Sequence, residues 1–559
     1  MNAKTNKINK NNSKNKDSVN YFAKYFSYVG KYIKEKYRFL ILLLVGLLAV
    51  STLNFFKIST TESVASFRLD DFEIGQVADR TIVASRSLPA DEEHPFAIEK
   101  GEKIIRKGWS ISETEYAKLQ KMSSSPVYID YRAFANNEMF ILFIAILWYM
   151  LFSFLPFKRK LDIKEPILQL VFFCLTYAAA AFGGKISFFS GQYALCIIIP
   201  AGLFAMLVTI LYNQLSAVLL SFIMSLGVLC ACGYDIVPFV YTLATALIST
   251  AVVRKIERRM DLVLASVILS LFNAAFSVVL IVIFNETFTE MGKVLVGVAL
   301  NGFLSGILTL GFLTPLEYML NTASVFRLMD LSDLNNPLMR KMLVNASGTY
   351  NHSMMVAQLA ESACREIDAN PLLARVGAYY HDIGKIDQSE YFVENQHGQN
   401  KHDDINPTLS ATVIKSHVKK GVEKAHQLHF PQVIIDIIAE HHGNSVISYF
   451  YNEAKEKDAS LSPEDFSYPG PPPSTRESGV VMLADTVEAA CRTLENPSVT
   501  RLEKFITQLI NAKVEHKQLN NCDLTYRDIS KIKEAFVQVL AGYYHSRIEY
   551  PDQKDPDKD

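Results

Sequence analysis

An adjacent histidine and aspartate, His381-Asp382, end an apolar helical stretch where packing alone would not place two polar side chains. Pro371 suits the first position of the preceding helix, and apolar residues recur after it at spacings of three and four. His381 should therefore face the core, and Gly384 is expected to stop the helix as a left-handed cap residue. Because a buried aspartate needs a cation nearby, the pair indicates half of a metal site.

Four other places repeat this pattern of a polar side chain on or at the end of an apolar helical stretch. They are His352, His417, His441-His442 and Asp485. One such histidine is usually a hydrogen-bonded core residue, but five such places together favour metal ligation. The seven side chains would supply imidazole nitrogens and two carboxylates, a mixed set suited to Mn, Fe or similar divalent ions. Seven ligands exceed one tetrahedral zinc site and suit two metals with one bridging carboxylate.

The charge of such a centre points to its substrate. Two divalent ions and two carboxylates leave a charge of about +2, which a hydroxide and one phosphodiester anion would neutralise. Lys385, one turn beyond the His-Asp pair, is a candidate to neutralise the phosphate or assist the leaving oxygen, with a surface lysine as the equal alternative. The polar loop that contains His402 is a weaker candidate for the border of the substrate mouth.

The 559-residue chain also has a membrane-embedded part, since half of its residues are hydrophobic and apolar runs of spanning length recur. Ten Lys or Arg residues between Lys4 and Arg38 precede the first run, so the amino terminus should be cytoplasmic. An even number of spans returns the chain to the cytoplasm, and the plasma membrane is the expected location. We predict eight spans: 39–56, 138–156, 166–183, 194–212, 215–233, 236–253, 261–284 and 294–320.

The remaining segments complete a mainly α fold, in which a polytopic helical membrane domain is followed by an all-α bundle. A short extracytoplasmic segment, 57–137, has minor β structure at Glu102–Arg106, between Gly101 and Gly108. An amphipathic connecting helix is expected at 321–346 and the helical bundle at 347–550. Residues 1–38 should form a basic cytoplasmic tail that is disordered up to about residue 20, and 551–559 should be a disordered tail. The net charge of −1 gives no reason to expect a nucleic-acid polymer as partner, whereas membrane lipid is expected.

An ordered set of motifs in the last third of the chain carries a family resemblance. The motifs are Gly348-Thr349-Tyr350-Asn351-His352-Ser353, Tyr380-His381-Asp382-Ile383-Gly384-Lys385, Phe392-Val393-Glu394-Asn395-Gln396, His441-His442-Gly443, Phe466-Ser467-Tyr468-Pro469-Gly470 and Leu483-Ala484-Asp485-Thr486-Val487-Glu488-Ala489-Ala490. In these motifs the chain resembles the HD superfamily of metal-dependent phosphohydrolases, and within it the PgpH-type seven-transmembrane-HD family.

The resemblance implies a cytoplasmic phosphodiesterase that hydrolyses cyclic di-AMP to linear pApA at a two-metal centre, with Mn or Fe as the expected ions. It implies that Asp382 bridges the ions. We hypothesise that the metals lower the pKa of a shared water, which attacks phosphorus in line. A homodimer is left open, and the substrate-binding residues are unknown. The implied ligands are His352, His381 and Asp485 for one metal and His417, His441 and His442 for the other.

Three alternatives stay open on the sequence alone. Hydrolysis of cyclic di-GMP is disfavoured because no Gly-Tyr-Pro follows His441-His442-Gly443. A (p)ppGpp or nucleotide hydrolase is compatible with the same metals, since they bind phosphate rather than base. A non-catalytic HD receptor module is the third, and the full ligand set argues against it.

Overall fold

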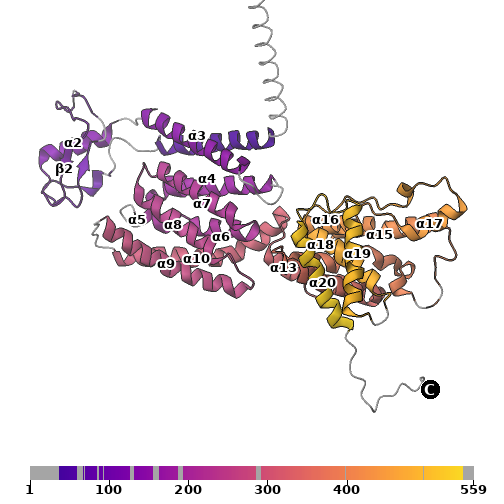
Figure 1. Ribbon diagram of the computed structural model, residues 1–559. Helices are drawn as coiled ribbons and strands as arrows, with labels where there is room; N and C mark the ends of the chain where they lie inside the picture. The colour runs from indigo at the N-terminus through magenta and orange to yellow at the C-terminus, as the bar shows by residue number, and fades with distance from the viewer. Residues whose placement is uncertain are drawn as a thin grey trace, which may run out of the picture. The chain divides into compact units, whose positions relative to one another are not determined.

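The computed structural model describes residues 37–58, 67, 69–84, 87–91, 93–125, 131–154, 163–186, 193–284, 291–396, 398, 400–494 and 497–544. These residues are mostly helical, which confirms the mainly α prediction. They form two compact units, one up to Lys255 and from Met260 to Leu310, and one of Ile256–Arg259 together with the chain from Gly311 onward (Figure 1). Residues 1–36 and 545–559 lie outside the described residues, and both predicted disordered segments fall there.

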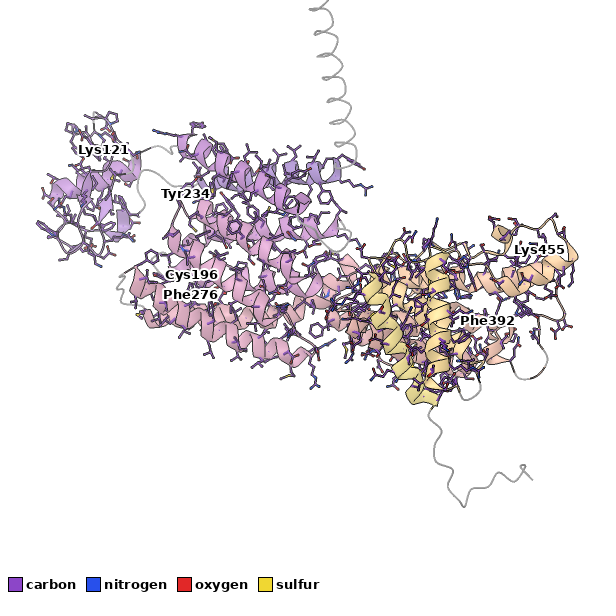
Figure 2. All side chains as sticks on the ribbon, in the orientation of Figure 1. Lys121, Cys196, Tyr234, Phe276, Phe392 and Lys455 are labelled. Carbon is purple, nitrogen blue, oxygen red and sulfur yellow. The ribbon has the colours of Figure 1, made fainter. Side chains whose placement is uncertain are left out.

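A small mixed fold lies between the first two long apolar helices of the chain. It consists of η1 (Leu69–Asp71), β1 (Ile82–Val83), β2 (Lys103–Ile105) and α2 (Glu113–Ser124). β1 and β2 pair antiparallel, with Ile82 opposite Ile105, so the predicted strand is confirmed. Lys121, labelled in Figure 2, is 4% exposed and donates to the carbonyl oxygens of Pro89 and Phe96, which ties α2 to the loop before β2.

Seven described helices are long and apolar enough to cross a membrane, with α5 and α6 counted together. The remaining predicted span, 236–253, is occupied by α8, which is apolar but has only 17 residues. The helices of this region are Tyr37–Ile58, α3 (Tyr131–Phe154), α4 (Lys164–Ile186), α5 (Tyr193–Ile198), α6 (Ala201–Leu211), α7 (Gln214–Ala231), α8 (Ile236–Val252), α9 (Arg259–Ile283) and α10 (Met291–Leu320).

The predicted span 194–212 is interrupted between α5 and α6. Pro200 has no backbone N–H and its ring disfavours the helical turn before it, so the helix breaks there. Asn301 of α10 donates from Nδ2 to the carbonyl oxygens of Ile197 and Ile199, at 2.8 and 3.2 Å. This contact satisfies backbone groups that the break would leave unpaired inside a membrane.

The single connecting helix predicted at 321–346 is wrong, because the structure has two short helices, α11 (Val325–Leu331) and α12 (Pro337–Asn345). Pro337 is the first residue of α12 and Asn336 caps it, a pairing that starts a new helix and prevents the previous one from continuing. The predicted apolar stripe is also only partly buried, since Leu328 is 1% exposed while Leu343 is 46% exposed.

The rest of the second unit is an all-helical bundle with three buried clusters of apolar side chains among the described residues, of which the one around Phe466 is the smallest. α13 packs against α14, α18 and α20, and α15 packs against α16 and η2. The elements are α13 (Ser347–Glu366), α14 (Pro371–Tyr380), η2 (Ile383–Tyr391), η3 (Val393–Asn395), α15 (Pro407–Gln427), α16 (Gln432–Glu440), α17 (Ser448–Lys457), η4 (Pro463–Phe466), α18 (Arg476–Cys491), α19 (Val499–Glu515) and α20 (Tyr526–Tyr544).

Candidate metal centre

The structure brings all seven predicted ligands into one cluster. α13 carries His352, the end of α14 carries His381-Asp382, α15 carries His417, the end of α16 carries His441-His442, and α18 carries Asp485. Six of the seven residues are buried, and the side chain of His442 is 22% exposed. Three groups have ligand atoms within 4.8 Å of one another. Two of them share no residue, His352, His381 and Asp485 on one side and His417, His441 and His442 on the other, and the third, His381, Asp382 and His441, links these two groups.

Asp382 lies between these two groups and turns one carboxylate oxygen toward each. Its Oδ1 is 3.3 Å from Nε2 of His417 and 3.7 Å from Nε2 of His441. Its Oδ2 is 3.2 Å from Nε2 of His381 and 3.7 Å from Nε2 of His352. This division of its oxygens would allow the carboxylate to bridge two cations, one on each side.

Backbone contacts orient three of the imidazoles. Nδ1 of His381, His417 and His441 each contacts the backbone carbonyl oxygen three residues earlier, at 2.7, 2.6 and 2.8 Å respectively. When Nδ1 carries the proton and donates it, Nε2 keeps its lone pair and faces the centre. The helices therefore fix both the tautomer and the direction of the nitrogen that a metal would take.

His352 is oriented by a side chain instead. Its Nδ1 contacts the Glu488 carboxylate, and its Nε2 lies 3.0 Å from Oδ1 of Asp485. Glu488 also pairs with Arg492 one turn further along α18. The sequence interpretation gave Glu488 no role, although an acid one turn after Asp485 on a buried helix is the signal that could have found it.

The side chain of Lys385 lies between two carboxylates and is 12% exposed, so Lys385 is not a surface lysine. Its Nζ is 2.7 Å from Oδ2 of Asp382 and 3.0 Å from Oε1 of Glu394. Thr349 also donates to Glu394, at 3.0 Å. The ring of Phe392, labelled in Figure 2, lies 4.9 Å from the Lys385 ammonium. Glu394 was quoted only as part of a motif, and its role as the second partner of Lys385 is visible only in three dimensions.

The charges of the cluster suit bound cations. Burial lowers the pKa of His417 to about 4 and that of His441 to about 3, so both are neutral near pH 7. Burial also acts to lower the pKa of His381, but Asp382 and Asp485 outweigh it and raise this pKa to about 10. Burial acts to raise the pKa of Asp382, but Lys385 and His381 outweigh it and hold this pKa well below its usual range.

Two atoms at the middle of the cluster are buried without a hydrogen-bond partner, Nε2 of His381 and Oδ1 of Asp382. Buried polar atoms are almost always satisfied, so a pair of orphaned ligand atoms needs an explanation. Nitrogen and carboxylate donors that face one another without hydrogen bonds fit divalent cations. The assignment of individual ligands to individual ions remains a prediction.

Two glycines beside the ligands have different roles. Gly443 has φ +54°, the left-handed conformation that commonly follows the end of a helix. The left-handed cap predicted at Gly384 is wrong, since its φ is not in that region and it continues into η2. Gly384 is required by close packing, because a Cβ there would lie 1.9 Å from the carbonyl oxygen of His417.

Two residues outside the ligand set need a comment: His402, which was a predicted candidate, and Tyr468, for which no role was predicted. His402 is buried with its Nε2 2.7 Å from the carbonyl oxygen of Tyr391, so it belongs to a separate contact. Tyr468 was quoted in a motif without a role, and its ring stacks on His442 with centroids 4.2 Å apart. It thereby forms one wall beside the ligand that is most open to solvent.

Comparisons with known proteins agree with this architecture. A family model for the HD domain matches residues 349–490, and one for the 7TM receptor with intracellular HD hydrolase matches residues 135–324. The cyclic-di-AMP phosphodiesterase PgpH of Bacillus subtilis is 36% identical over 369 residues, which are 64% of this chain and 51% of the relative. The protein of the same name from Listeria monocytogenes is 33% identical over 481 residues, 84% of this chain and 66% of the relative.

The crystal structure of the L. monocytogenes PgpH HD domain in complex with cyclic-di-AMP is 43% identical, covers 38% of this chain and 100% of that chain, and has a TM-score of 0.37. The present chain spans about half the length of the B. subtilis relative and about two thirds of the L. monocytogenes one. Both family models and both sequence relatives point the same way: the chain belongs to the PgpH-type family, which joins a seven-transmembrane region to an HD hydrolase domain.

Proposed function

We propose that this chain is a membrane-anchored, metal-dependent phosphodiesterase that hydrolyses cyclic di-AMP to linear pApA. The observation that carries the proposal is the position of Asp382, which directs one oxygen to each of two ligand groups. The substrate is supported by the relatives, two of which are named cyclic-di-AMP phosphodiesterase.

Two divalent ions held by the two groups would supply Lewis acidity and a water of lowered pKa. The protein's own residues account for the rest of the site. Backbone carbonyls and Glu488 fix the ring orientation of four of the five imidazoles, which directs their Nε2 atoms to the centre before an ion enters. Lys385 keeps Asp382 ionised and fixes the direction of its Oδ2.

In the proposed reaction, water adds across one P–O3′ bond of the cyclic dinucleotide. A P–O bond to the attacking oxygen forms, the P–O3′ bond breaks, and the ribose oxygen leaves with a proton. The 5′-phosphate remains on its own nucleoside, so the product is pApA. Lys385 already contacts two carboxylates, so its proposed role is to hold Asp382 in place. The leaving oxygen is then protonated by solvent, which reaches the site on the exposed side of His442.

We further propose that the HD domain faces the cytoplasm and that Mn or Fe is the physiological metal. The orientation rests on the basic residues before Tyr37–Ile58 and on Arg254–Arg259 between α8 and α9. The metal identity rests on the mixture of imidazole and carboxylate donors.

The test uses the full chain, purified in detergent and supplied with Mn. Cyclic di-AMP, cyclic di-GMP and ppGpp are offered in parallel, and products are separated by chromatography. The proposal predicts pApA as the product, with the largest kcat/KM for cyclic di-AMP. Faster turnover of either other nucleotide would overturn the substrate assignment, and binding of cyclic di-AMP without turnover would favour a receptor module.

A further inference from the structure

A second lysine, Lys513, is largely buried near the metal centre and takes no part in the ligand cluster. It lies on α19, whose Leu502, Ile506 and Ile510 are fully buried against the bundle. Lys513 continues the same face, three residues after Ile510, where an apolar residue would be expected. A lysine in such a position is costly unless its ammonium group has a specific partner.

The tip of Lys513 reaches the loop that follows the metal ligands of α16. Its Nζ donates to Oγ of Ser445 at 3.0 Å. Ser445 comes three residues after His442 and is held from the other side by the backbone N–H of Tyr468, which donates to its carbonyl oxygen at 3.0 Å. Tyr468 in turn stacks on His442, so the ammonium group lies in the same wall of the site as the exposed ligand.

The charge of Lys513 is not compensated by a contact with a carboxylate. Burial lowers its pKa, and the more distant Asp485 opposes this effect only in part. Among the described residues it forms no ion pair, and the Ser445 hydroxyl is neutral. Lys385 differs in this respect, because two carboxylates lie within 3.0 Å of its ammonium group.

A cyclic dinucleotide has one more negative charge than the metal centre can balance. Two divalent ions, Asp382, Asp485, a hydroxide and the phosphodiester under attack sum to about zero. The second phosphodiester keeps its full charge and needs a cation elsewhere. We propose that Lys513 binds this second, uncleaved phosphodiester and so selects for substrates with two phosphates, an inference that rests on the proposed function.

The alternative is that Lys513 only holds the loop in place. The structure supplies other bonds for that purpose. Gln518 donates from Nε2 to Oδ1 of Asn444 at 2.6 Å, and its Oε1 accepts from the Asn444 backbone N–H at 3.4 Å. Together with the Tyr468 contact, these bonds fix residues 444 and 445 without Lys513. Loss of the ammonium group should therefore leave the loop and the metal ligands in place.

The experiment compares the wild type, Lys513→Met and Ser445→Ala as full-length proteins loaded with Mn. Methionine keeps the apolar stem and removes the charge, whereas Ser445→Ala removes the hydroxyl partner and keeps the charge. Each protein is assayed with cyclic di-AMP and with bis(p-nitrophenyl) phosphate, which has a single phosphodiester. Lys513→Met should lower kcat/KM for cyclic di-AMP by about ten- to a hundredfold, mainly through KM. Its rate on the single diester should be unchanged, and Ser445→Ala should stay near wild type on both substrates.

An equal loss on both substrates, or a loss in Ser445→Ala as large as in Lys513→Met, would overturn the inference and assign Lys513 to the loop. No change on either substrate would also overturn it. Failure of the proposed function would look different, because the wild type itself would then cleave the single diester and not cyclic di-AMP. That result would also remove the proposed role of Lys513.

Discussion

Nζ of Lys385 lies 2.7 Å from Oδ2 of Asp382, the oxygen that faces His381 and His352. The Lys385 ammonium group therefore contacts the carboxylate that would bridge the metals. It balances the charge of Asp382 before any ion is bound, and it restricts the rotation of the carboxylate. The pair explains how an aspartate that is 1% exposed can remain ionised in the metal-free protein.

Replacing Lys385 with methionine should destabilise the HD domain by about 3–5 kcal/mol in the absence of metal, because Asp382 and Glu394 would lose their shared partner. Thermal unfolding of the stripped full-length protein, followed by circular dichroism, measures the change. Lys401→Met is the matched control, since the side chain of Lys401 is 53% exposed and its ion pair with Glu390 is long, with 3.7 Å between Nζ and Oε1. Equal unfolding of the two variants would contradict the structural role of Lys385.

Replacing Glu488 with glutamine should weaken metal binding on the His352 side by about ten- to a hundredfold, because Nδ1 of His352 loses its carboxylate partner. The other group should keep its affinity, since backbone carbonyls orient His417 and His441. Calorimetric titration with Mn resolves the two events. Glu503→Gln, on the exposed face of α19, serves as the control. Unchanged affinity in Glu488→Gln would show that the contact does not orient the ligand.

Alanine at Gly384 should disturb the centre through the backbone. A Cβ there would lie 1.9 Å from the carbonyl oxygen of His417 and 2.7 Å from the backbone nitrogen of Gly421, and neither atom can rotate away. We expect a loss of about 1–3 kcal/mol or more in stability, together with weaker metal binding by His417. Gly542→Ala on α20 is the control, because no atom lies within 4 Å of its Cβ position. A Gly384→Ala protein as stable as this control would refute the close packing of η2 on α15.

Metal loading should release protons near pH 8. Asp382 and Asp485 raise the pKa of His381 to about 10, so this imidazole is protonated in the stripped protein near pH 8 and must lose a proton to bind, and the pKa of His352 is raised as well. His417 and His441 are already neutral, with pKa values of about 4 and about 3. Affinity for Mn should therefore rise with pH until about pH 10, where His381 also loses its proton in the stripped protein. Calorimetry in two buffers of different ionisation enthalpy counts the protons, and proton uptake on loading would contradict this charge assignment.

Much of the site could be predicted from the sequence because its ligands interrupt apolar periodicity. His381 and Asp485 both occupy positions where a buried helix should carry an apolar side chain, and the structure brings them together. The partners of the ligands were harder to predict. Lys513 and Ser445 are 68 residues apart, and their contact depends on how α19 packs. The separation of the connecting segment into α11 and α12 had a local signal in the sequence, Pro337, but the amphipathic pattern of 321–346 favoured a single helix.

The most direct test of the account is the number of Mn ions bound per chain, determined by elemental analysis of the full-length protein and of its Asp382→Ala variant. The two ligand groups and the bridging position of Asp382 predict two ions per chain in the wild type. They predict one or none in the variant, with cyclic di-AMP hydrolysis reduced to background. A wild type that binds a single ion, or an Asp382→Ala protein that keeps two ions and its activity, would contradict the two-metal centre.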